Sequence, residues 1–329
     1  IMFYMSMITG TLIAVSSNSW ITMWVGLEVN LLSIIPLMSN IKNKMESEAA
    51  MKYFITQAMA STIFMLAIII MLSNNDSLVS SKISSMILDL AILTKMGAAP
   101  LHFWFPEVME GLSWINAMIM LTWQKIAPMI IFMYSTKPLM FTTSIIIISM
   151  MVSGLMGINQ TSMRKILAYS SINHIGWMMA AMITNQTLWM IYFMTYTLMT
   201  INVTSMFKML NISNMGQLMN SMNQSKTIKT MFSLNFLSLG GIPPFIGFFP
   251  KWITINCLIQ EKMYMLTFIM IIMTLMTLVF YMRIMFASGI VTMTESNIVK
   301  NKKLNQNIII SNFVILSLIA SCPMFISFI

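Results

Sequence analysis

Long apolar runs separated by short polar stretches dominate this sequence. A run of roughly 20 apolar residues crosses the hydrocarbon core of a bilayer as an α-helix. The pattern therefore predicts an all-α, polytopic membrane protein with about eleven transmembrane helices. The expected spans are residues 1–17, 20–39, 47–73, 82–99, 110–134, 138–158, 161–183, 186–210, 226–259, 263–288 and 306–329.

No long soluble domain separates these spans. The longest polar stretches are about 211–226 and 289–306, and both are expected to be loops. We therefore treat residues 1–329 as a single membrane domain, in which 306–329 forms the final helix.

Composition supports a membrane location. Hydrophobic residues make up 58% of the chain and charged residues 8%, whereas soluble domains carry about 25% charged residues. The formal net charge of +9 does not require a nucleic-acid partner. Lysines that flank membrane spans produce the same excess through the positive-inside bias.

The distribution of Lys and Arg predicts the orientation. Of the 18 such residues, twelve fall in loops on the N-terminal side, three on the opposite side and three inside spans. This bias places the N-terminus on the positive side, which is the matrix or the cytoplasm. The twelve are Lys42, Lys44, Lys52, Arg164, Lys165, Lys208, Lys226, Lys229, Arg283, Lys300, Lys302 and Lys303.

The three lysines inside spans are the strongest functional signal. Lys95 opens KMGAAPLHFWFP, Lys125 lies in LTWQKIAP and Lys251 lies near the end of GGIPPFIGFFPKW. A lysine at membrane depth costs about 2.5–3.5 kcal/mol on insertion scales, so it is a functional candidate by default. Two of the three stand beside expected helix breaks, at Gly97–Pro100 and at Gly240–Pro244. Irregular backbone at that depth survives only inside protein or beside a water-filled cavity.

One carboxylate matches these lysines. Glu28 lies in the middle of a span, within WVGLEVNLLSIIP. Burial disfavours the charged form of a carboxylate, and a nearby lysine favours it. A glutamate that gains or loses a lysine partner can therefore act as a switch, and the alternative is a protonated Glu28 in an interhelical hydrogen bond. Asp89 precedes Lys95 by six residues, about 240° around the helix, so the two do not face one another.

Each lysine also has a structural interpretation. Lys95 lies near the end of its span and could extend its ammonium group to an interface. The same interpretation is less plausible for Lys125. Lys251 could follow a simple kink. The functional interpretation of Lys251 rests on Pro243 and Pro244, which lack N–H groups and leave upstream carbonyls open to water or a cation.

His174 lies in the apolar stretch YSSINHIGW. Ser170 and Ser171 precede it by four and three residues and share its helix face, which predicts a polar stripe. A histidine can relay protons near neutral pH, and a packed, hydrogen-bonded histidine is an equal alternative. His102 lies in the break segment, where an interfacial position is favoured. Glu107 and Glu110 are expected in a solvated loop.

The two expected breaks suggest an internal duplication. They lie five spans apart, so equivalent ends face opposite sides of the membrane. That arrangement is typical of inverted-topology repeats, in which broken helices mark the transport site. The approximate repeats are 1–134 and 138–288.

Motifs for bound cofactors and metals are absent from the sequence. Cys257 and Cys322 lie far apart and form no CxxC pair, so neither an iron–sulfur cluster nor a zinc site is indicated. No GxGxxG follows a strand, which argues against a nucleotide-binding fold.

Several motifs together carry a family resemblance: GLEVNLLSIIPL, KMGAAPLHFWFPEVMEGL, LTWQKIAP, SSINHIGW and SLGGIPPFIGFFPKW. In this order, over about residues 16–252, the chain resembles the antiporter-like membrane subunits of respiratory complex I (NADH–ubiquinone oxidoreductase) of animal mitochondria. Asp89 departs from the family pattern, which expects an uncharged or weakly polar residue there.

The resemblance implies a proton-translocating subunit in the mitochondrial inner membrane, with its N-terminus in the matrix. It assigns Glu28, Lys95, Lys125 and Lys251 to half-channels and a hydrated axis, with His174 on that axis. Neighbouring membrane-arm subunits and lipids such as cardiolipin are the implied partners. The chain itself is expected to bind no cofactor, since NADH, FMN, iron–sulfur clusters and ubiquinone belong to other subunits. The alternatives are a free-standing cation/proton antiporter and a purely structural subunit.

Overall fold

The computed structural model describes residues 1–40, 43–73, 78–135, 138–222, 226–243 and 245–290. Within these ranges the chain forms helices and turns without a strand, so the all-α prediction is confirmed there. An isolated antiparallel bridge pairs Ser162 with Asn214. The chain divides into two compact units, residues 1–149 and 150–329, and the boundary falls within one helix.

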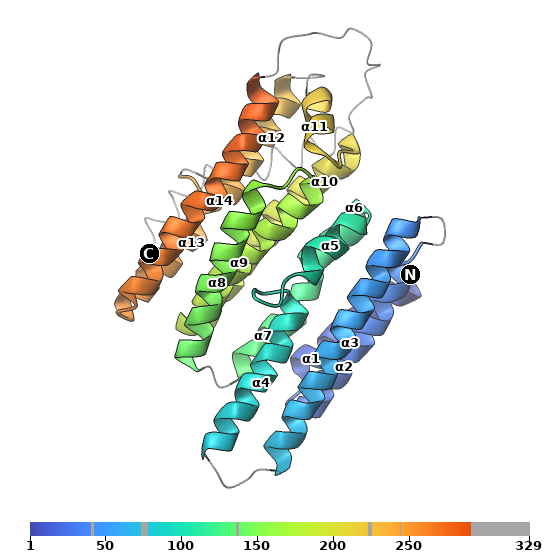
Figure 1. Ribbon diagram of the computed structural model, residues 1–329, viewed down its shortest axis with the longest axis vertical. Coiled ribbons are helices and arrows are strands. Elements are labelled where there is room, and N and C mark those ends of the chain that lie inside the picture. The colour runs from blue at the N-terminus through green and yellow to red at the C-terminus, as the bar shows by residue number, and fades with distance from the viewer. Residues whose placement is uncertain (41–42, 74–77, 136–137, 223–225, 244, 291–329) are drawn as a thin grey trace. The chain divides into compact units, whose positions relative to one another are not determined.

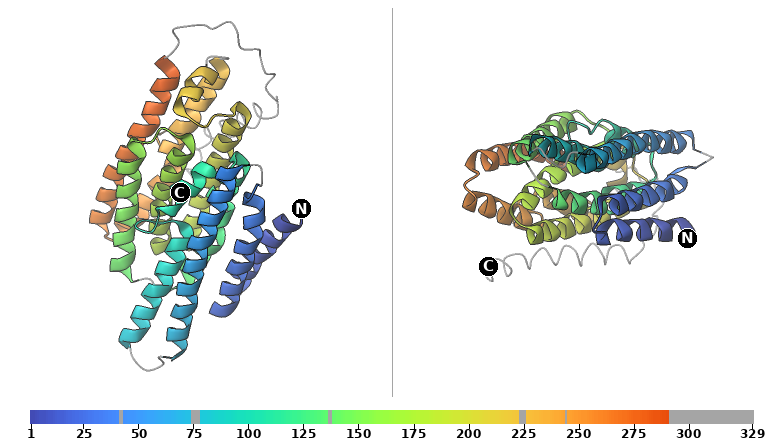
Figure 2. Two further views of the ribbon diagram at one scale, coloured as in Figure 1. Left: turned by 45° about the vertical axis from the view of Figure 1, so that its right-hand side comes forward. Right: turned by 90° about the horizontal axis from the view of Figure 1, so that it is seen from below.

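Unit 1 contains the helices that carry Glu28, Lys95 and Lys125 (Figure 1). α3 and α4 lie side by side in it (Figure 2). The helices are α1 (Met2–Ser16), α2 (Trp20–Met38), α3 (Lys44–Ser73), α4 (Leu78–Met96), α5 (Trp104–Gly111), α6 (Trp114–Leu121), α7 (Trp123–Tyr134) and the first part of α8 (Leu139–Ile158).

Unit 2 contains the remainder of α8 and the helices that carry His174 and Lys251. These are α9 (Met163–Thr184), α10 (Gln186–Leu210), α11 (Met215–Met222), α12 (Lys226–Gly240), α13 (Phe248–Gln260) and α14 (Tyr264–Ile290).

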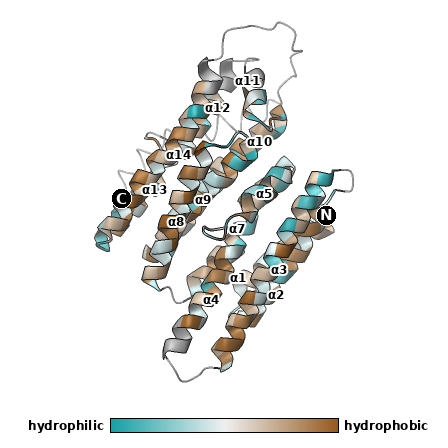
Figure 3. Cartoon of the chain, in the orientation of Figure 1, coloured by the Kyte–Doolittle hydropathy of each residue, from teal (hydrophilic) through white to brown (hydrophobic). Residues whose placement is uncertain are grey.

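Six helical stretches in the described part of the chain are long and apolar enough to cross a membrane. Apolar residues run along most of α3, α8 and α14, whereas hydrophilic residues gather at the start of α3 (Figure 3). The expected final span, 306–329, lies outside the described residues.

The span expected at 110–134 corresponds to Trp114–Tyr134, which is long and apolar enough to cross a membrane and in which Thr122 separates α6 from α7. Two other details of the sequence prediction are wrong. The loop expected at 211–226 contains α11. Glu107 and Glu110 are exposed as expected, but they belong to α5 and not to a loop. In both cases a short helix stands where polar residues suggested a loop, because about two helical turns leave little periodic signal.

Some lysines counted as loop residues also lie in helices. α3 begins at Lys44, so Lys44 and Lys52 occupy its first turns. Polar side chains at the end of a membrane helix still lie near the interface, so the charge bias keeps its value for orientation.

Small residues seat α2 against α1. A Cβ on Gly26 would lie 2.8 Å from Cβ of Ala14, and a Cβ on Gly10 would lie 2.8 Å from the backbone N of Asn30. Close approach through glycine is a common way to pack membrane helices. This packing against α1 fixes the position of α2, the helix that carries Glu28.

α4 and α12 end in the same way. Gly97 follows α4 with φ 73° and Gly241 follows α12 with φ 76°, a left-handed conformation that glycine adopts without steric cost. The amide of Ala98 donates to Leu93 O, and the amide of Ile242 donates to Leu237 O. These bonds close a Schellman motif at each helix end and stop the helix there.

Candidate functional site

Lys95 is buried in the last turn of α4, with 8% of its surface exposed. The neighbouring carbonyl of Thr94 accepts a hydrogen bond of 3.1 Å from Nε1 of Trp104, the first residue of α5. Burial argues against the alternative in which the ammonium group extends to an interface. The lysine instead lies inside unit 1, at a helix end that a neighbouring side chain caps.

Glu28 of α2 interacts electrostatically with Lys95. These two described residues do not form an ion pair within 4.0 Å. Oε1 of Glu28 is buried and has no hydrogen-bond partner. The two groups act on one another without direct contact. Gain or loss of a proton by either group therefore changes their interaction energy.

Lys125 is 2% exposed and lies in the first turn of α7, directly after the interruption at Thr122. Its Nζ lies 5.6 Å from the ring centroid of Phe105, within cation–π range. Phe105 belongs to α5 and also packs against Gly97, where a Cβ would lie 3.2 Å from that of Phe105. One aromatic side chain of α5 therefore contacts both the end of α4 and the lysine of α7.

Two amides, which the sequence interpretation did not single out, join α2 to α7. Asn30 Nδ2 donates to Gln124 Oε1 at 3.1 Å, and Gln124 Nε2 donates to Asn30 Oδ1 at 2.9 Å. Both side chains are buried. Their signal in the sequence was an amide within an apolar span, two residues after Glu28 in one case and directly before Lys125 in the other. Such amides need partners on neighbouring helices.

Asp89 and His102 are both buried in unit 1. Asp89 has 0% exposure within α4. His102 is 3% exposed, and its Nδ1 lies 3.2 Å from Pro100 O in the segment between α4 and α5. The ring packs against Phe103, and the interfacial position favoured for His102 by the sequence stays a prediction.

Lys251 in unit 2 is 5% exposed and caps the end of another helix. Its Nζ donates a hydrogen bond of 2.8 Å to Gly240 O, at the end of α12. The same Nζ lies 6.0 Å from the ring centroid of Trp177 on α9. The sequence predicted unpaired carbonyls upstream of the two prolines, and in the structure Lys251 donates a hydrogen bond to one of them, Gly240 O.

His174 of α9 contacts two tyrosines of α10. Its Nδ1 and the Tyr192 hydroxyl are 2.9 Å apart, and the tautomer decides which atom donates. The ring of Tyr196 lies 5.0 Å away, centroid to centroid. Ser170 and Ser171 donate their hydroxyl protons to carbonyls of their own helix.

A hydrogen bond does link one of those serines to the histidine cluster. Ser171 also bonds with the Tyr196 hydroxyl. The result is a buried polar cluster of serine, tyrosine and histidine, and hydroxyl and imidazole groups of this kind can pass protons.

The predicted residues therefore form two groups. Unit 1 brings together Glu28, Lys95 and Lys125 around α5. In unit 2, α9 carries both His174 and the Trp177 ring that Lys251 contacts. Within the described ranges, no three His, Cys, Asp or Glu side chains gather in a way that could hold a metal ion.

Comparison with protein families matches most of the chain. Residues 17–277 match the family model described as NADH:quinone oxidoreductase/Mrp antiporter, transmembrane region. A curated relative, NADH-ubiquinone oxidoreductase chain 2 of Anopheles gambiae, is 46% identical over 323 residues, which cover 95% of this chain and 93% of the relative.

Solved structures have the same fold. A chain of respiratory complex I from Thermus thermophilus superposes with a TM-score of 0.86 at 21% identity, and the match covers 97% of this chain and 77% of that one. A chain of the Mrp complex from Dietzia sp. DQ12-45-1b matches with a TM-score of 0.74 at 15% identity, over 87% and 59% of the two chains. At these identities the likeness concerns the fold alone.

Proposed function

The chain belongs to the NADH:quinone oxidoreductase/Mrp antiporter family of membrane proteins, and on that premise we propose that it is a proton-translocating membrane subunit of NADH:ubiquinone oxidoreductase (respiratory complex I). Relatives that cover nearly the whole chain carry that complex's name. The chain acts as part of an enzyme, and its own residues handle protons rather than electrons.

The observation that carries the proposal is the burial of three lysines. Lys95, Lys125 and Lys251 are 8%, 2% and 5% exposed, and each lies beside a helix end. Cations kept in such surroundings are costly, so a function that needs them is the simplest reason for their presence.

The proposed mechanism begins with Glu28 and Lys95. Charged Glu28 stabilises the protonated form of Lys95, and protonation of Glu28 removes that stabilisation. One pKa unit corresponds to about 1.36 kcal/mol, and moving one charge across 100 mV requires about 2.3 kcal/mol. A change of about two pKa units in one pair is therefore large enough to load or release a proton against the membrane potential.

Lys125 is the next proton carrier in unit 1, and Phe105 stabilises its ammonium form through the ring face. In unit 2, Lys251 exchanges its proton while attached to the end of α12. His174 relays protons through Tyr192. Each of these groups changes its charge when it gains or loses a proton. The location of the proton therefore affects the helix ends that these groups contact.

The proposal includes about eleven spans and an inverted repeat, approximately 1–134 and 138–288. In this scheme α4 with α5, and α12 with α13, are the two interrupted helices. The matching glycine ends at Gly97 and Gly241 support it, as does the side-chain donor that each end receives from the following helix, Trp104 in one case and Lys251 in the other.

We place the chain in the mitochondrial inner membrane with its N-terminus in the matrix, among other membrane-arm subunits and lipids. The matrix location of the N-terminus rests on the charge bias of the loops. Partner subunits would supply NADH oxidation and quinone reduction.

A native assembly provides the test. Membranes are solubilised in mild detergent, the complex that contains the chain is isolated, and its subunits are identified. Reconstituted in closed vesicles, this complex should take up protons when NADH and a quinone are supplied. The fold shared with an Mrp complex favours a cation/proton antiporter as the second candidate. Cation-dependent proton flux through the purified chain alone, without NADH, would support that candidate and contradict our proposal.

A further inference from the structure

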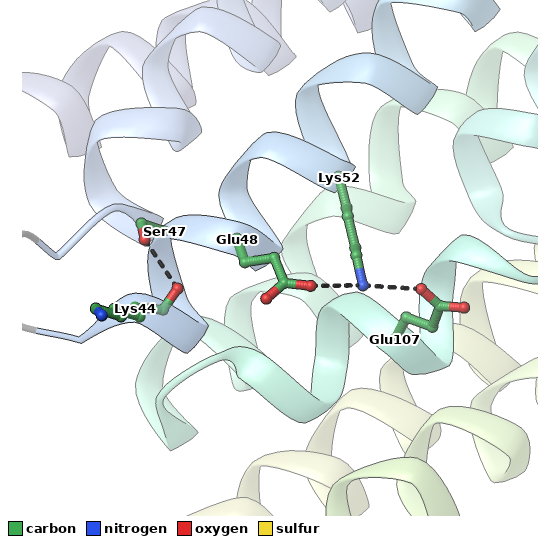
Figure 4. Close-up of polar contacts among 5 residues, drawn as sticks. All are labelled: Lys44, Ser47, Glu48, Lys52 and Glu107. Carbon is green, nitrogen blue, oxygen red and sulfur yellow. Dashed lines mark hydrogen bonds and ion pairs between the residues drawn. The ribbon is translucent and has the colours of Figure 1, made fainter.

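A three-residue ion network joins α3 to α5 (Figure 4). Lys52 Nζ lies 2.9 Å from Glu48 Oε1 and 3.1 Å from Glu107 Oε2. Glu48 belongs to the same helix as Lys52, one turn earlier, whereas Glu107 belongs to α5. The Glu107 arm therefore joins two helices, and the Glu48 arm does not.

The contact between α3 and α5 continues beyond the charges. A Cβ on Gly111 of α5 would lie 2.6 Å from Met45 O, so the two helices touch through their backbones there. About two turns further along α3, the rings of Tyr53 and Trp104 lie 5.8 Å apart. Both ends of α5 therefore pack against the first turns of α3.

Other side chains of α5 reach the helices of the buried lysines. Trp104 Nε1 donates to Thr94 O, next to Lys95. The Phe105 ring faces Lys125 Nζ at 5.6 Å. Two consecutive residues of one short helix therefore contact both proton-carrying sites of unit 1.

We propose that Lys52, acting through Glu107, is a positioning residue for the buried lysines of unit 1. The inference rests on the proposed function, since it assigns Lys52 to the same proton pathway. α5 has eight residues, too few for a helix to be stable without tertiary contacts. The Lys52–Glu107 bridge sets where α5 lies along α3, and α5 in turn sets the position of the Phe105 ring and the Trp104 indole.

An orienting role suits this network better than a stabilising one. Its three side chains are between 42% and 60% exposed, and exposed ion pairs contribute little to stability. A small displacement of α5 nevertheless changes the distance between Phe105 and Lys125, and electrostatic contacts with a buried cation vary steeply with distance.

Two variants with the same change in charge provide a matched test. Glu107→Gln removes the arm that joins the helices, and Glu48→Gln removes the arm within α3. The measurement is NADH-driven proton uptake per assembled complex in closed vesicles. We expect Glu107→Gln to lower uptake by about two- to fivefold, the scale of an exposed ion pair, while Glu48→Gln stays close to wild type. Equal effects of the two variants would overturn the proposal.

Rescue separates positioning from general damage. Lys52→Arg keeps the bridge and should retain wild-type uptake, whereas Lys52→Met should behave like Glu107→Gln. If Glu107→Gln fails to assemble, the charge swap Lys52→Glu with Glu107→Lys decides: restored assembly and uptake support the proposal, and failure to restore them overturns it. Lys125→Met in the same preparation tests the pathway itself. If Lys125→Met leaves uptake unchanged, the proposed function fails. If Lys125→Met abolishes uptake while Glu107→Gln leaves it unchanged, only the role proposed for Lys52 fails.

Discussion

Lys251 Nζ donates a hydrogen bond of 2.8 Å to the carbonyl oxygen of Gly240. The ammonium group thereby caps the C-terminus of α12, where unpaired carbonyls and the helix dipole favour a positive charge. Loss of a proton from Lys251 weakens this cap. The protonation state of the lysine and the end of the helix are therefore coupled by a direct contact.

Gly241→Ala tests that coupling. A Cβ at this position would lie 2.8 Å from Lys251 Nζ, and the left-handed backbone costs an alanine about 1–2 kcal/mol. We expect lower thermal stability of the solubilised complex together with reduced NADH-driven proton uptake. Gly216→Ala is the matched control, because no atom lies within 4 Å of its added Cβ. Similar behaviour of the two variants would mean that the α12 end does not constrain Lys251.

The sequence predicted the elements better than the contacts. Apolar runs located the longer helices to within a few residues, since each expected span had to be long enough to cross a bilayer, but they missed the short helices α5 and α11. Lysine at membrane depth marked Lys95, Lys125 and Lys251 because a buried charge is rare and costly. Their roles and the count of about eleven spans stay predictions.

What the sequence could not supply was the choice of partners. Nothing in LTWQKIAP indicates that Gln124 bonds Asn30, 94 residues earlier. The serines before His174 were natural partners by helical spacing, yet they donate to their own backbone, and Tyr192 of another helix bonds the ring. Partner choice depends on how helices pack against one another, and the periodicity of a single helix contains no information about its neighbour.

The amide pair of Asn30 and Gln124 should act as one unit. We expect a double-mutant cycle of Asn30→Ala and Gln124→Ala to give a coupling energy of about 0.6–1.7 kcal/mol, the range for polar contacts between membrane helices. Thermal unfolding of the solubilised complex provides the four stabilities. Asn202→Ala is the control partner, since Asn202 bonds Asn235 instead. Additive effects of the Asn30 and Gln124 changes would contradict the reciprocal hydrogen bonds.

Lys125→Met should lower NADH-driven proton uptake while the complex still assembles. Methionine keeps the length and apolar stem of the side chain, so the packing around α7 should change little. Subunit content by native gel and the proton-to-electron ratio in vesicles are the two measurements. Loss of assembly would show that the lysine is structural, and an unchanged ratio would remove it from the pathway.

The orientation of the chain can be tested without mutation. The distribution of Lys and Arg, twelve on the N-terminal side and three on the other, predicts that the N-terminus faces the matrix. We expect a membrane-impermeant amine reagent on the intermembrane side to leave Lys42, Lys44 and the 290–305 segment unlabelled. Labelling of these positions in intact organelles would show that the topology is inverted and that the predicted number of spans is wrong.

Glu28→Gln should lower turnover and leave folding nearly intact. The amide has almost the shape of the acid but cannot carry its charge, and that charge is what acts on Lys95. The protonated lysine then loses a stabilising field, and each 1.36 kcal/mol of lost interaction lowers its proton affinity about tenfold. Glu28→Asp should be milder, because the charge persists on a shorter side chain.

Both Glu28 variants are compared by NADH–quinone turnover and by proton uptake in intact vesicles. The order wild type, then Asp, then Gln is the one that a charge requirement produces. If Gln matches wild type, or if Asp is worse than Gln, the shape of the side chain matters and its charge does not. Glu28 would then be a protonated hydrogen-bond donor between helices, a role that an amide fills adequately.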